Sequence, residues 1–421
     1  MTQTQHHQLM MLCVVGAGPV GLELAVAAVR QGRLLLPHAQ NCHIRARSAQ
    51  HPSHCAHMCG LWRAGMEVTV VERGAEIAAN VREWQHVELF SPWSLNMSKT
   101  GTEVLKEMGA PLPDAAAFPT GRELISEYLE VLHAFLQKSG KCRFKMGTEL
   151  VSIGRATFLK RDHIGANGAR KGAPFRLLLQ ATSGPPPHAE EVLTDCSFLA
   201  DCTGTWNQPN WCGAGGVPAI GERRGVIEAR ILQHIPTPQA CAACVGKRIC
   251  VVGAGASAIT CINALGQAAV AAKGTIHVLW VVRRPSEPYS RVANDPLPQR
   301  DRLYAQVCVC VRVCSCLHVC VCVRARACVR LQIRTNTQGN VLYADQAGCE
   351  GLQVTYLKGS VVDEFRCQSG GAVTVAVVDA AGGGGGQRVE EDVDLVVSCC
   401  GFRPDDALWR EVCVGSGVSA S

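Results

Sequence analysis

Short apolar runs followed by longer amphipathic stretches occur in two separate parts of the chain. The first set comprises an apolar run at 9–15, a glycine-rich turn, an Ala/Val/Leu pattern that ends at Arg30, and a second apolar run at 68–71. The second set comprises an apolar run at 248–252, a turn at 253–258, a helical pattern at 259–271 and an apolar run at 275–282. Each set predicts a strand, a tight turn, a helix and a second strand. Since such units build parallel sheets, the chain is predicted to be α/β.

The rest of the pattern predicts further elements around these two units. Residues 118–137 have a helical period after Pro119-Thr120-Gly121. Three apolar runs predict strands of a small antiparallel meander, at 148–160, 175–182 and 196–202. The glycine run 382–386 separates two further strand-like runs, 372–378 and 393–397, and is typical of a hairpin loop rather than of a ligand-binding loop.

Two segments interrupt this organisation. Residues 33–64 are rich in His and Cys, have neither a helical nor a strand period, and are interpreted as an insertion into a surface loop of the first unit. Residues 307–330 alternate Val with Cys and then with Arg and Ala. Translation of a GT-rich dinucleotide repeat gives this alternation, so the segment is interpreted as a translated low-complexity repeat. Sequencing of the mature transcript tests whether the segment is present there and in frame. A strand with a cysteine ladder is the alternative.

The composition and charge of the chain argue against several classes of protein. The net charge of +6 comes from 41 basic and 35 acidic residues spread along 421 positions, which argues against a nucleic-acid surface. No apolar run is long enough to span a bilayer, and residues 1–8 lack a secretory signal, so a cytoplasmic protein is expected. Many of the 24 cysteines are in the two interrupting segments, which favours a reducing compartment over a disulfide framework.

The first glycine-rich turn has the G-x-G-x-x-G pattern of a dinucleotide-binding loop. It consists of Gly16, Ala17, Gly18, Pro19, Val20 and Gly21. In this fingerprint the first glycine makes the turn, the second admits a pyrophosphate, and the third lets helix pack on strand. Glu72 ends the next strand and is followed by Arg73, and both are predicted to bind the cofactor. The Glu72 carboxylate is placed to accept hydrogen bonds from a ribose. A tight turn that binds nothing is the alternative.

The second turn repeats the pattern with alanine at the third position. It consists of Gly253, Ala254, Gly255, Ala256, Ser257 and Ala258. Arg283 and Arg284, rather than an acidic residue, follow the next strand. Because a guanidinium there can hold the 2′-phosphate of the adenosine, NADPH is predicted in preference to NADH. A solvated basic strand end is the alternative interpretation of these arginines.

With these motifs the chain resembles the two-dinucleotide-binding-domain flavoproteins, which include flavin-containing and Baeyer-Villiger monooxygenases and thioredoxin-reductase-like proteins. Asp201-Cys202-Thr203-Gly204-Thr205-Trp206, with Pro209, is similar to the D-A-T-G element of these proteins, and Gly401-Phe402-Arg403-Pro404-Asp405 to their A-T-G-F-R-P-D element. The resemblance implies two Rossmann-type domains, each a three-layer sandwich, with FAD bound by the first and NADPH by the second. It places Thr203, Gly204 and Gly401 among the cofactor-binding residues.

The resemblance also implies a domain order in which the FAD domain contains an inserted NAD(P)H domain. We predict an FAD domain at 1–211, an NAD(P)H domain at 212–398, and a return to the FAD domain at 399–421 that is apparently truncated. The segments Trp84–Val87, Leu89–Trp93 and Pro119–Leu124 are most similar to a monooxygenase-like branch. That similarity places Trp84 and residues 91–93 near the flavin, with Asn96 within reach of it, although a core aromatic cluster explains Trp84, Phe90 and Trp93 equally well.

The implied activity is that NADPH reduces FAD, after which electrons pass to O₂ or to a small-molecule acceptor. The F-x-G-x-x-x-H fingerprint of the named monooxygenases is absent, and Cys399 and Cys400 replace the usual Ala and Thr. No catalytic acid or base is assigned, and the oligomeric state is left open.

Two competing interpretations of the function remain, and a metal site is not favoured. Cys241 and Cys244 form a C-x-x-C, which would suit a thioredoxin-reductase-like disulfide reductase. A catalytically defective nucleotide-binding product of an imperfect gene model is the other alternative. His54, Cys55, His57 and Cys59 match no closed zinc spacing, so no metal is predicted.

Overall fold

The computed structural model describes most of the chain, and its contacts divide the chain into two compact units. Unit 1 comprises Met1–Asn207 and Pro404–Ser421, and unit 2 comprises Gln208–Arg403. The residues described are 10–31, 43–45, 66–162, 173–285, 297, 299, 334–335, 341–342, 351–380, 388–405 and 407–412. The predicted low-complexity segment 307–330, the glycine run 382–386 and most of 33–64 lie outside them.

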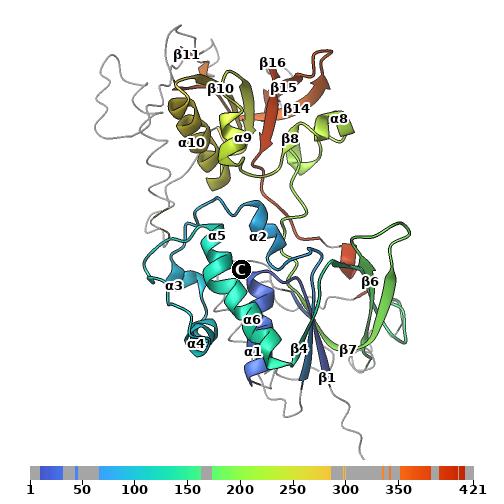
Figure 1. The fold of residues 1–421 in the computed structure, drawn as a ribbon. Coiled ribbons are helices and arrows are strands. Elements are labelled where there is room, and N and C mark those ends of the chain that lie inside the picture. Colours follow the sequence, from blue (N-terminus) through green and yellow to red (C-terminus); the bar gives the residue numbers. More distant parts are fainter. Residues whose placement is uncertain are drawn as a thin grey trace, which may run out of the picture. The chain divides into compact units, whose positions relative to one another are not determined.

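Unit 1 is built on a mixed sheet whose strand order is β4-β3-β1-β7-β6-β5, with β2 paired to β7 (Figure 1). Its strands are β1 (Met10–Val15), β2 (His43–Arg45), β3 (Met66–Val71), β4 (Cys142–Lys145), β5 (Thr148–Arg155), β6 (Phe175–Ala181) and β7 (Glu190–Asp201). Its helices are α1 (Pro19–Gln31), α2 (Ala79–Glu83), α3 (Trp93–Asn96), α4 (Lys99–Glu107), α5 (Gly121–Glu123), η2 (Leu124–Leu129), α6 (Glu130–Ser139) and η4 (Ala407–Trp409).

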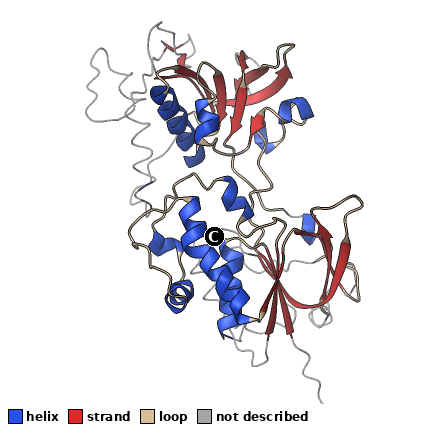
Figure 2. Cartoon of the chain, in the orientation of Figure 1, coloured by secondary structure: helices blue, strands red, loops and turns tan. Residues whose placement is uncertain are grey.

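The parallel part of this sheet is buried on both faces, as the alternation along β1 shows. Leu12 and Val14 pack into a core with helices α1, α4 and α6, whereas Cys13 and Val15 pack into a second core with β5, β6 and η4. Successive side chains of a strand point to opposite faces, so a continuous apolar run serves both cores. The unit therefore has a helix layer, a sheet layer and an antiparallel strand layer (Figure 2).

Strand β7 connects the central sheet with the antiparallel meander. Its last residues pair in parallel with β1, while its earlier residues pair antiparallel with β6, which in turn pairs antiparallel with β5. The run predicted at 196–202 is thus the second half of a longer strand. Within the segment interpreted as an insertion without strand periodicity, His43–Arg45 forms the short strand β2, which pairs in parallel with Leu199–Asp201. The sequence pattern did not predict this strand, because three residues are too few to show a period.

A single continuous helical segment, α5-η2-α6, covers residues 121–139 of unit 1. It begins with a capping box, in which the Thr120 side chain accepts a hydrogen bond from the Glu123 backbone and the Glu123 carboxylate accepts one from Thr120 N. These bonds to Thr120 lower the pKa of Glu123. The segment ends at Gly140, which has φ 65°. The predicted helix at 118–137 therefore lies within a few residues of the observed one.

A buried carboxyl group ties this helical segment to α1 and α4. Glu23, only 8% exposed, accepts hydrogen bonds from the Tyr128 hydroxyl and from both the backbone and the hydroxyl of Ser98. Burial raises the pKa of Glu23, although these hydrogen bonds act in the opposite direction. The folded unit therefore holds a proton on Glu23 at pH values where the unfolded chain has lost it.

We expect the Glu23→Gln variant to have a flatter pH dependence of stability than the parent. Because the folded-state pKa is raised, the folded state binds more protons, and the free energy of unfolding falls as pH rises from about 4.3 through the folded-state pKa. Glutamine keeps the size of the side chain and cannot ionise. Urea unfolding at a series of pH values measures the difference, with the exposed Glu127→Gln as the control. Equal slopes for the parent and Glu23→Gln would rule out this role of Glu23.

Unit 2 has a parallel sheet of order β13-β10-β9-β17-β8 and a separate antiparallel sheet of order β14-β15-β16. Its strands are β8 (Ile231–Leu232), β9 (Arg248–Val252), β10 (Thr275–Val282), β11 (Arg334–Thr335), β12 (Val341–Leu342), β13 (Gly351–Lys358), β14 (Ser360–Cys367), β15 (Val373–Asp379), β16 (Val389–Val393) and β17 (Leu395–Ser398). Its helices are η3 (Ala214–Gly216), α8 (Gly225–Glu228), α9 (Pro238–Ala242) and α10 (Ala256–Ala271).

The layers of unit 2 repeat those of unit 1. Ile249 and Val251 of β9 pack into a core with α9 and α10, whereas Cys250 and Val252 pack into a core that includes residues of the antiparallel sheet. Two expectations from the sequence need correction. Helix α10 begins at Ala256 rather than at residue 259, so the glycine turn is shorter than predicted. The apolar run 393–397 is not one strand, because it is divided at Asp394 between β16 and β17.

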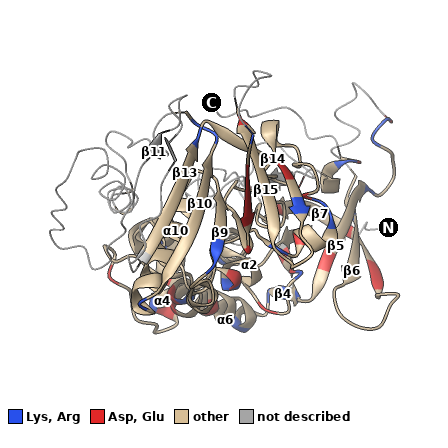
Figure 3. Cartoon of the chain, turned by 90° about the horizontal axis from the view of Figure 1, so that it is seen from above, with Lys and Arg blue, Asp and Glu red and all other residues tan. Residues whose placement is uncertain are grey.

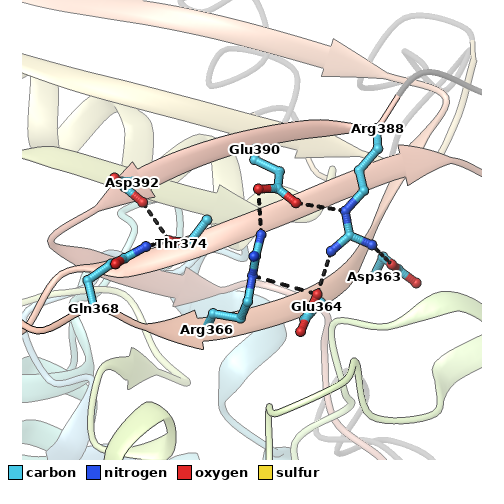
Figure 4. Close-up of polar contacts among 8 residues, drawn as sticks. All are labelled: Asp363, Glu364, Arg366, Gln368, Thr374, Arg388, Glu390 and Asp392. Atoms are coloured by element: carbon cyan, nitrogen blue, oxygen red, sulfur yellow. Dashed lines mark hydrogen bonds and ion pairs between the residues drawn. The ribbon is translucent and has the colours of Figure 1, made fainter.

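The outer face of the antiparallel sheet carries a network of ion pairs (Figure 4). Arg388 contacts Asp363, Glu364 and Glu390, and Arg366 contacts Glu364 and Glu390. The network joins β14 to Arg388 and Glu390 at the start of β16, across the central strand β15, and so helps to hold the register of this sheet.

Basic and acidic residues are interspersed along the ribbon of both units (Figure 3). None of the helices in the described residues has the length and apolar character needed to cross a membrane.

Candidate functional site

The first glycine loop joins β1 to α1, and each of its glycines has a distinct environment. Gly16 has φ 102°, and a Cβ atom on it would lie 2.6 Å from the carbonyl oxygen of Cys202. A Cβ on Gly21 would lie 1.9 Å from the carbonyl oxygen of Gly16. Around Gly18, by contrast, a Cβ would meet no described atom within 4 Å. The loop therefore needs its first and third glycines for the fold and leaves open space at the second.

Glu72 lies directly beside this loop, at the end of β3. Its Oε2 atom accepts a hydrogen bond of 2.7 Å from Ala17 N, and its Oε1 atom accepts one of 2.7 Å from Gly74 N. Gly16 N in turn donates to the carbonyl oxygen of Val71 over 2.7 Å. The long sequence separation between Gly16 and Glu72 is thus closed by the pairing of β1 with β3. Arg73 is exposed and contacts Asn207 and Glu149 instead of the loop.

The segment after β7 forms a wall of the same loop. Cys202 N donates to the carbonyl oxygen of Val15 over 2.8 Å, which holds the Cys202 carbonyl against Gly16. Asp201 is buried, and its Oδ1 atom accepts hydrogen bonds from the backbone and the hydroxyl of Thr203. Gly204 follows with φ 70°. The predicted residues Thr203 and Gly204 are therefore brought to the carboxyl ends of the strands, next to the glycine loop.

The aromatic residues predicted near a flavin lie in well-packed surroundings. Trp84 packs against Gly121, where a Cβ atom would lie 2.9 Å from Trp84 Cζ3, and Trp93 is 4% exposed in the helix-side core. Asn96 donates to the carbonyl oxygen of Ser91 over 2.7 Å and accepts from the Ser91 hydroxyl over 2.8 Å. These contacts agree with the core aromatic cluster weighed for Trp84 and Trp93.

The second glycine loop joins β9 to α10 in the same manner. Gly253 has φ 125°, and a Cβ on it would lie 2.4 Å from the carbonyl oxygen of Cys399. Gly255 is exposed, with no described atom within 4 Å of a Cβ built on it. Ala258, at the third position, is completely buried. Trp280 Nε1 donates to the carbonyl oxygen of Gly253 over 2.8 Å and fixes the turn from the neighbouring strand.

The remaining predicted residues of unit 2 lie at the carboxyl ends of its strands. Arg283 and Arg284 are exposed immediately after β10, and Arg284 O accepts a hydrogen bond of 3.0 Å from Gly359 N. Ala254 and Ala256 are partly buried and Ser257 is exposed within the loop and the first turn of α10. Gly401 has φ 81° and follows β17, and its carbonyl oxygen accepts a hydrogen bond from Asn210 N.

The two loops share one construction that sequence reasoning did not anticipate in full. In unit 1 the first glycine, Gly16, lies against the backbone carbonyl of Cys202, which follows β7. In unit 2 the first glycine, Gly253, lies against the backbone carbonyl of Cys399, which follows β17. Each of these cysteines donates its own N–H over 2.8 Å to the last residue of the first strand, Val15 or Val252. These are backbone contacts, so the identity of the side chains carried no signal for them.

Cys241 and Cys244 are both buried in the core beside α10. They are 1% and 4% exposed, and both are free thiols. Burial raises the pKa of Cys241 to about 11, and burial also raises the pKa of Cys244. Since thiolates are the reactive form of cysteine, this pair lacks the environment of an exchanging C-x-x-C.

Among the described residues, no group of three or more His, Cys, Asp or Glu side chains is arranged to hold a metal ion. His54, Cys55, His57 and Cys59 lie outside the described residues.

Comparison with known proteins identifies the fold. No family model matches the sequence, and no curated protein matches it significantly. A cadaverine monooxygenase of desferrioxamine biosynthesis from Erwinia amylovora, solved with bound FAD, is similar in structure over 96% of this chain and 81% of its own, with a TM-score of 0.54 and 11% identity. Thioredoxin reductase from Lactococcus lactis matches over 97% and 82%, with a TM-score of 0.47 and 12% identity. The first likeness confirms the predicted α/β fold with two Rossmann-type units, and with it the resemblance in fold to two-dinucleotide-binding-domain flavoproteins.

Proposed function

We propose that the chain is an FAD-dependent oxidoreductase in which unit 2 binds NADPH, unit 1 binds FAD, and electrons pass onward to O₂ or a small-molecule acceptor. The observation that carries this proposal is the shared construction of the two loops. Each has a first glycine pressed against a carbonyl and a second position open to a ligand, Gly18 in unit 1 and Gly255 in unit 2. Two dinucleotide loops in one chain favour transfer between two cofactors.

The residues of unit 1 fit the adenosine and pyrophosphate of FAD. The backbone at Gly18 precedes the 13-residue helix α1, whose first N–H groups have no partner within the helix and attract phosphate. Glu72 is held at the loop by Ala17 N, in position for its carboxylate to accept hydrogen bonds from ribose hydroxyls. We assign the predicted FAD domain to this unit.

The residues of unit 2 fit NADPH for the same reasons. Gly255 is the N-cap of the 16-residue helix α10, so its surroundings can accept a pyrophosphate. Arg283 and Arg284 follow the neighbouring strand, where a guanidinium can form paired hydrogen bonds to a 2′-phosphate. We assign the predicted NAD(P)H domain to this unit.

When bound at these two loops, NADPH would supply a hydride, and FAD would supply the means to pass two electrons to the next acceptor. The task of the protein's own residues is to bind and orient these groups, since hydride transfer needs closely aligned rings. The described residues near the loops include no acid or base that the geometry singles out for proton transfer to a substrate.

A monooxygenase-like acceptor chemistry is favoured over disulfide reduction. The burial of Cys241 and Cys244 and the raised pKa of both thiols disfavour exchange with an external disulfide. The FAD-bound protein of similar fold is a monooxygenase, which is consistent with this choice.

The visible spectrum of the purified protein tests the proposal. We expect a yellow flavin band that bleaches on addition of NADPH without oxygen and returns when air is admitted. Formation of product from an organic substrate during reoxidation would support the monooxygenase. Reoxidation with no oxygenated product from a panel of amines and ketones would favour an oxidase or a reductase. A colourless protein that acquires no band with added FAD would overturn the proposal and leave a defective nucleotide-binding protein.

Replacement of both Arg283 and Arg284 by alanine is expected to weaken the response to NADPH and not the response to NADH. Loss of charge-assisted hydrogen bonds of about 1.5–3 kcal/mol corresponds to a roughly 10- to 100-fold higher half-saturating concentration. Anaerobic bleaching of the flavin measures it for both nucleotides. The exposed Arg223→Ala variant of the same unit is the matched control. An equal loss for both nucleotides would contradict recognition of the 2′-phosphate.

A further inference from the structure

The two glycine loops differ in what contacts the carbonyl oxygen of the first glycine. In unit 1, Gly16 O lies close to helix α1, because a Cβ atom built on Gly21 would be only 1.9 Å from it. In unit 2, Gly253 O accepts a hydrogen bond of 2.8 Å from Trp280 Nε1. The third position of that loop is Ala258, whose own Cβ atom excludes the close approach seen in unit 1.

Trp280 has the same place in unit 2 that Val70 has in unit 1. The carbonyls of Val71 and Val281 accept the backbone N–H of the first glycine of their own unit, over 2.7 Å and 3.0 Å. The residues before them, Val70 and Trp280, therefore correspond, and both pack into the core on the helix side of their sheet. Because a valine side chain has no hydrogen-bond donor, only unit 2 has a group at this position that can bind the carbonyl.

The indole of Trp280 is itself held in place by packing. It is 1% exposed, in the core that α10 forms with β9 and β10 (Figure 1). The ring of Tyr356, on β13, packs against it with ring centroids 5.1 Å apart. A buried indole N–H group needs a hydrogen-bond partner, and the Gly253 carbonyl is that partner. The packing of β10 therefore sets the direction of one peptide group in the loop.

The other backbone contacts of Gly253 restrict the same peptide group. Its N–H donates to Val281 O, and a Cβ atom built on it would lie 2.4 Å from the carbonyl oxygen of Cys399. Its φ is 125°, whereas Gly16, whose loop has glycine at the third position, has φ 102°. Since its N–H, its Cα and its carbonyl oxygen are all contacted, the peptide group that leads towards Gly255 has one defined orientation.

We infer that Trp280 is a positioning residue for the nucleotide loop of unit 2. Its indole holds the Gly253 carbonyl away from α10, which makes room for Ala258 and sets the backbone up to Gly255 in the form that accepts a pyrophosphate. The effect on nucleotide affinity rests on the proposed function, whereas the effect on the loop backbone does not. Trp280 and Ala258 form a coupled pair, because the third position accommodates alanine only while the indole holds the carbonyl.

The Trp280→Phe variant removes the donor and keeps an aromatic ring in the core. We expect the half-saturating concentrations of NADPH and NADH in anaerobic flavin bleaching to rise about 10-fold each, because both nucleotides contain the pyrophosphate. The limiting rate of bleaching and the FAD content should not change. Calorimetric titration with NADP⁺, which needs no redox reaction, should show the same loss of affinity. Replacement of Arg283 and Arg284, in contrast, is expected to affect NADPH alone.

A second substitution tests the coupling directly. Adding Ala258→Gly to Trp280→Phe should restore NADP⁺ affinity to within about 3-fold of the parent, because glycine lets the Gly253 carbonyl approach α10 as Gly16 O approaches α1. In the parent, Ala258→Gly should give no such gain in affinity. Hydrogen exchange of peptides covering residues 253–259, measured without nucleotide, should be faster in Trp280→Phe than in the parent and should slow again in the double variant.

Leu352→Ala is the matched control for lost packing. Leu352 is 1% exposed in the same core, but it pairs with Ile276 near the amino end of the sheet, whereas the loop is at the carboxyl end. This variant should lower the stability of unit 2 and leave NADP⁺ affinity unchanged.

The outcomes separate this inference from the proposed function. Unchanged NADP⁺ affinity and exchange in folded Trp280→Phe, a loss that Ala258→Gly does not reduce, or failure of both the single and the double variant to fold would overturn the inference. Folding of the double variant alone would support it. A parent that binds no NADP⁺ would contradict the proposed function instead, and hydrogen exchange of residues 253–259 would still test the role of Trp280.

Discussion

The Gly18→Ala variant is expected to lose affinity for FAD while unit 1 stays folded. A Cβ atom at this position meets no described atom within 4 Å, so the substitution has little effect on packing in the free protein. The same methyl group would occupy the space that the second glycine leaves for a pyrophosphate. We expect binding to weaken by at least about 10-fold, which corresponds to roughly 1.4 kcal/mol. The ratio of flavin to protein absorbance and a titration with FAD measure the loss.

The neighbouring glycine provides the matched control. In Gly21→Ala the new methyl group would lie 1.9 Å from the carbonyl oxygen of Gly16, so this variant should lower the stability of unit 1 itself. Gly255→Ala, the equivalent of Gly18→Ala in unit 2, should leave the FAD content unchanged. Full flavin occupancy and unchanged affinity in Gly18→Ala would show that the loop of unit 1 does not hold a pyrophosphate.

Replacement of Trp409 by alanine is expected to destabilise unit 1 strongly. Trp409 is 4% exposed in the core beside β5 and β6, and its Nε1 atom donates to Asp201 Oδ2 over 2.9 Å. Removal of a buried aromatic side chain costs about 3–5 kcal/mol, and loss of the donor to a buried carboxylate adds to that cost. Denaturant unfolding measures the change in the free energy of unfolding.

A second variant separates the packing of Trp409 from its hydrogen bond. Trp409→Phe keeps most of the apolar volume and removes the donor, so we expect a loss of roughly 1–3 kcal/mol. Hydrogen exchange of β9 and β10 amides reports on unit 2 and should not change. A cost in Trp409→Ala no larger than in Trp409→Phe would contradict the packing contribution.

The sequence was sufficient to predict the two strand–turn–helix–strand units because their strands are buried on both faces. Continuous apolar runs such as 248–252 are then bounded by glycines that tight turns require, and both signals are local. The division of 393–397 at Asp394 was not predictable in this way. Val393 and Leu395 belong to different sheets, and each sheet is completed by strands distant in sequence.

The residues of the two glycine loops and Glu72 could be predicted from the sequence, whereas the backbone groups that pack against the loops could not. The glycines and Glu72 follow a pattern that has a physical reason, whereas the carbonyls of Cys202 and Cys399 act through backbone atoms.

The position of Trp409 has a consequence for the order in which the protein folds on the ribosome. All residues of unit 2 are synthesised before Trp409 and Val412, which fill the second core of unit 1. A nascent chain that has emerged only as far as residue 403 therefore contains the complete sequence of unit 2, but its Asp201 still lacks the indole donor. Unit 2 can therefore complete its folding first during translation, whereas the second core of unit 1 is complete only after residues 407–412 have been synthesised.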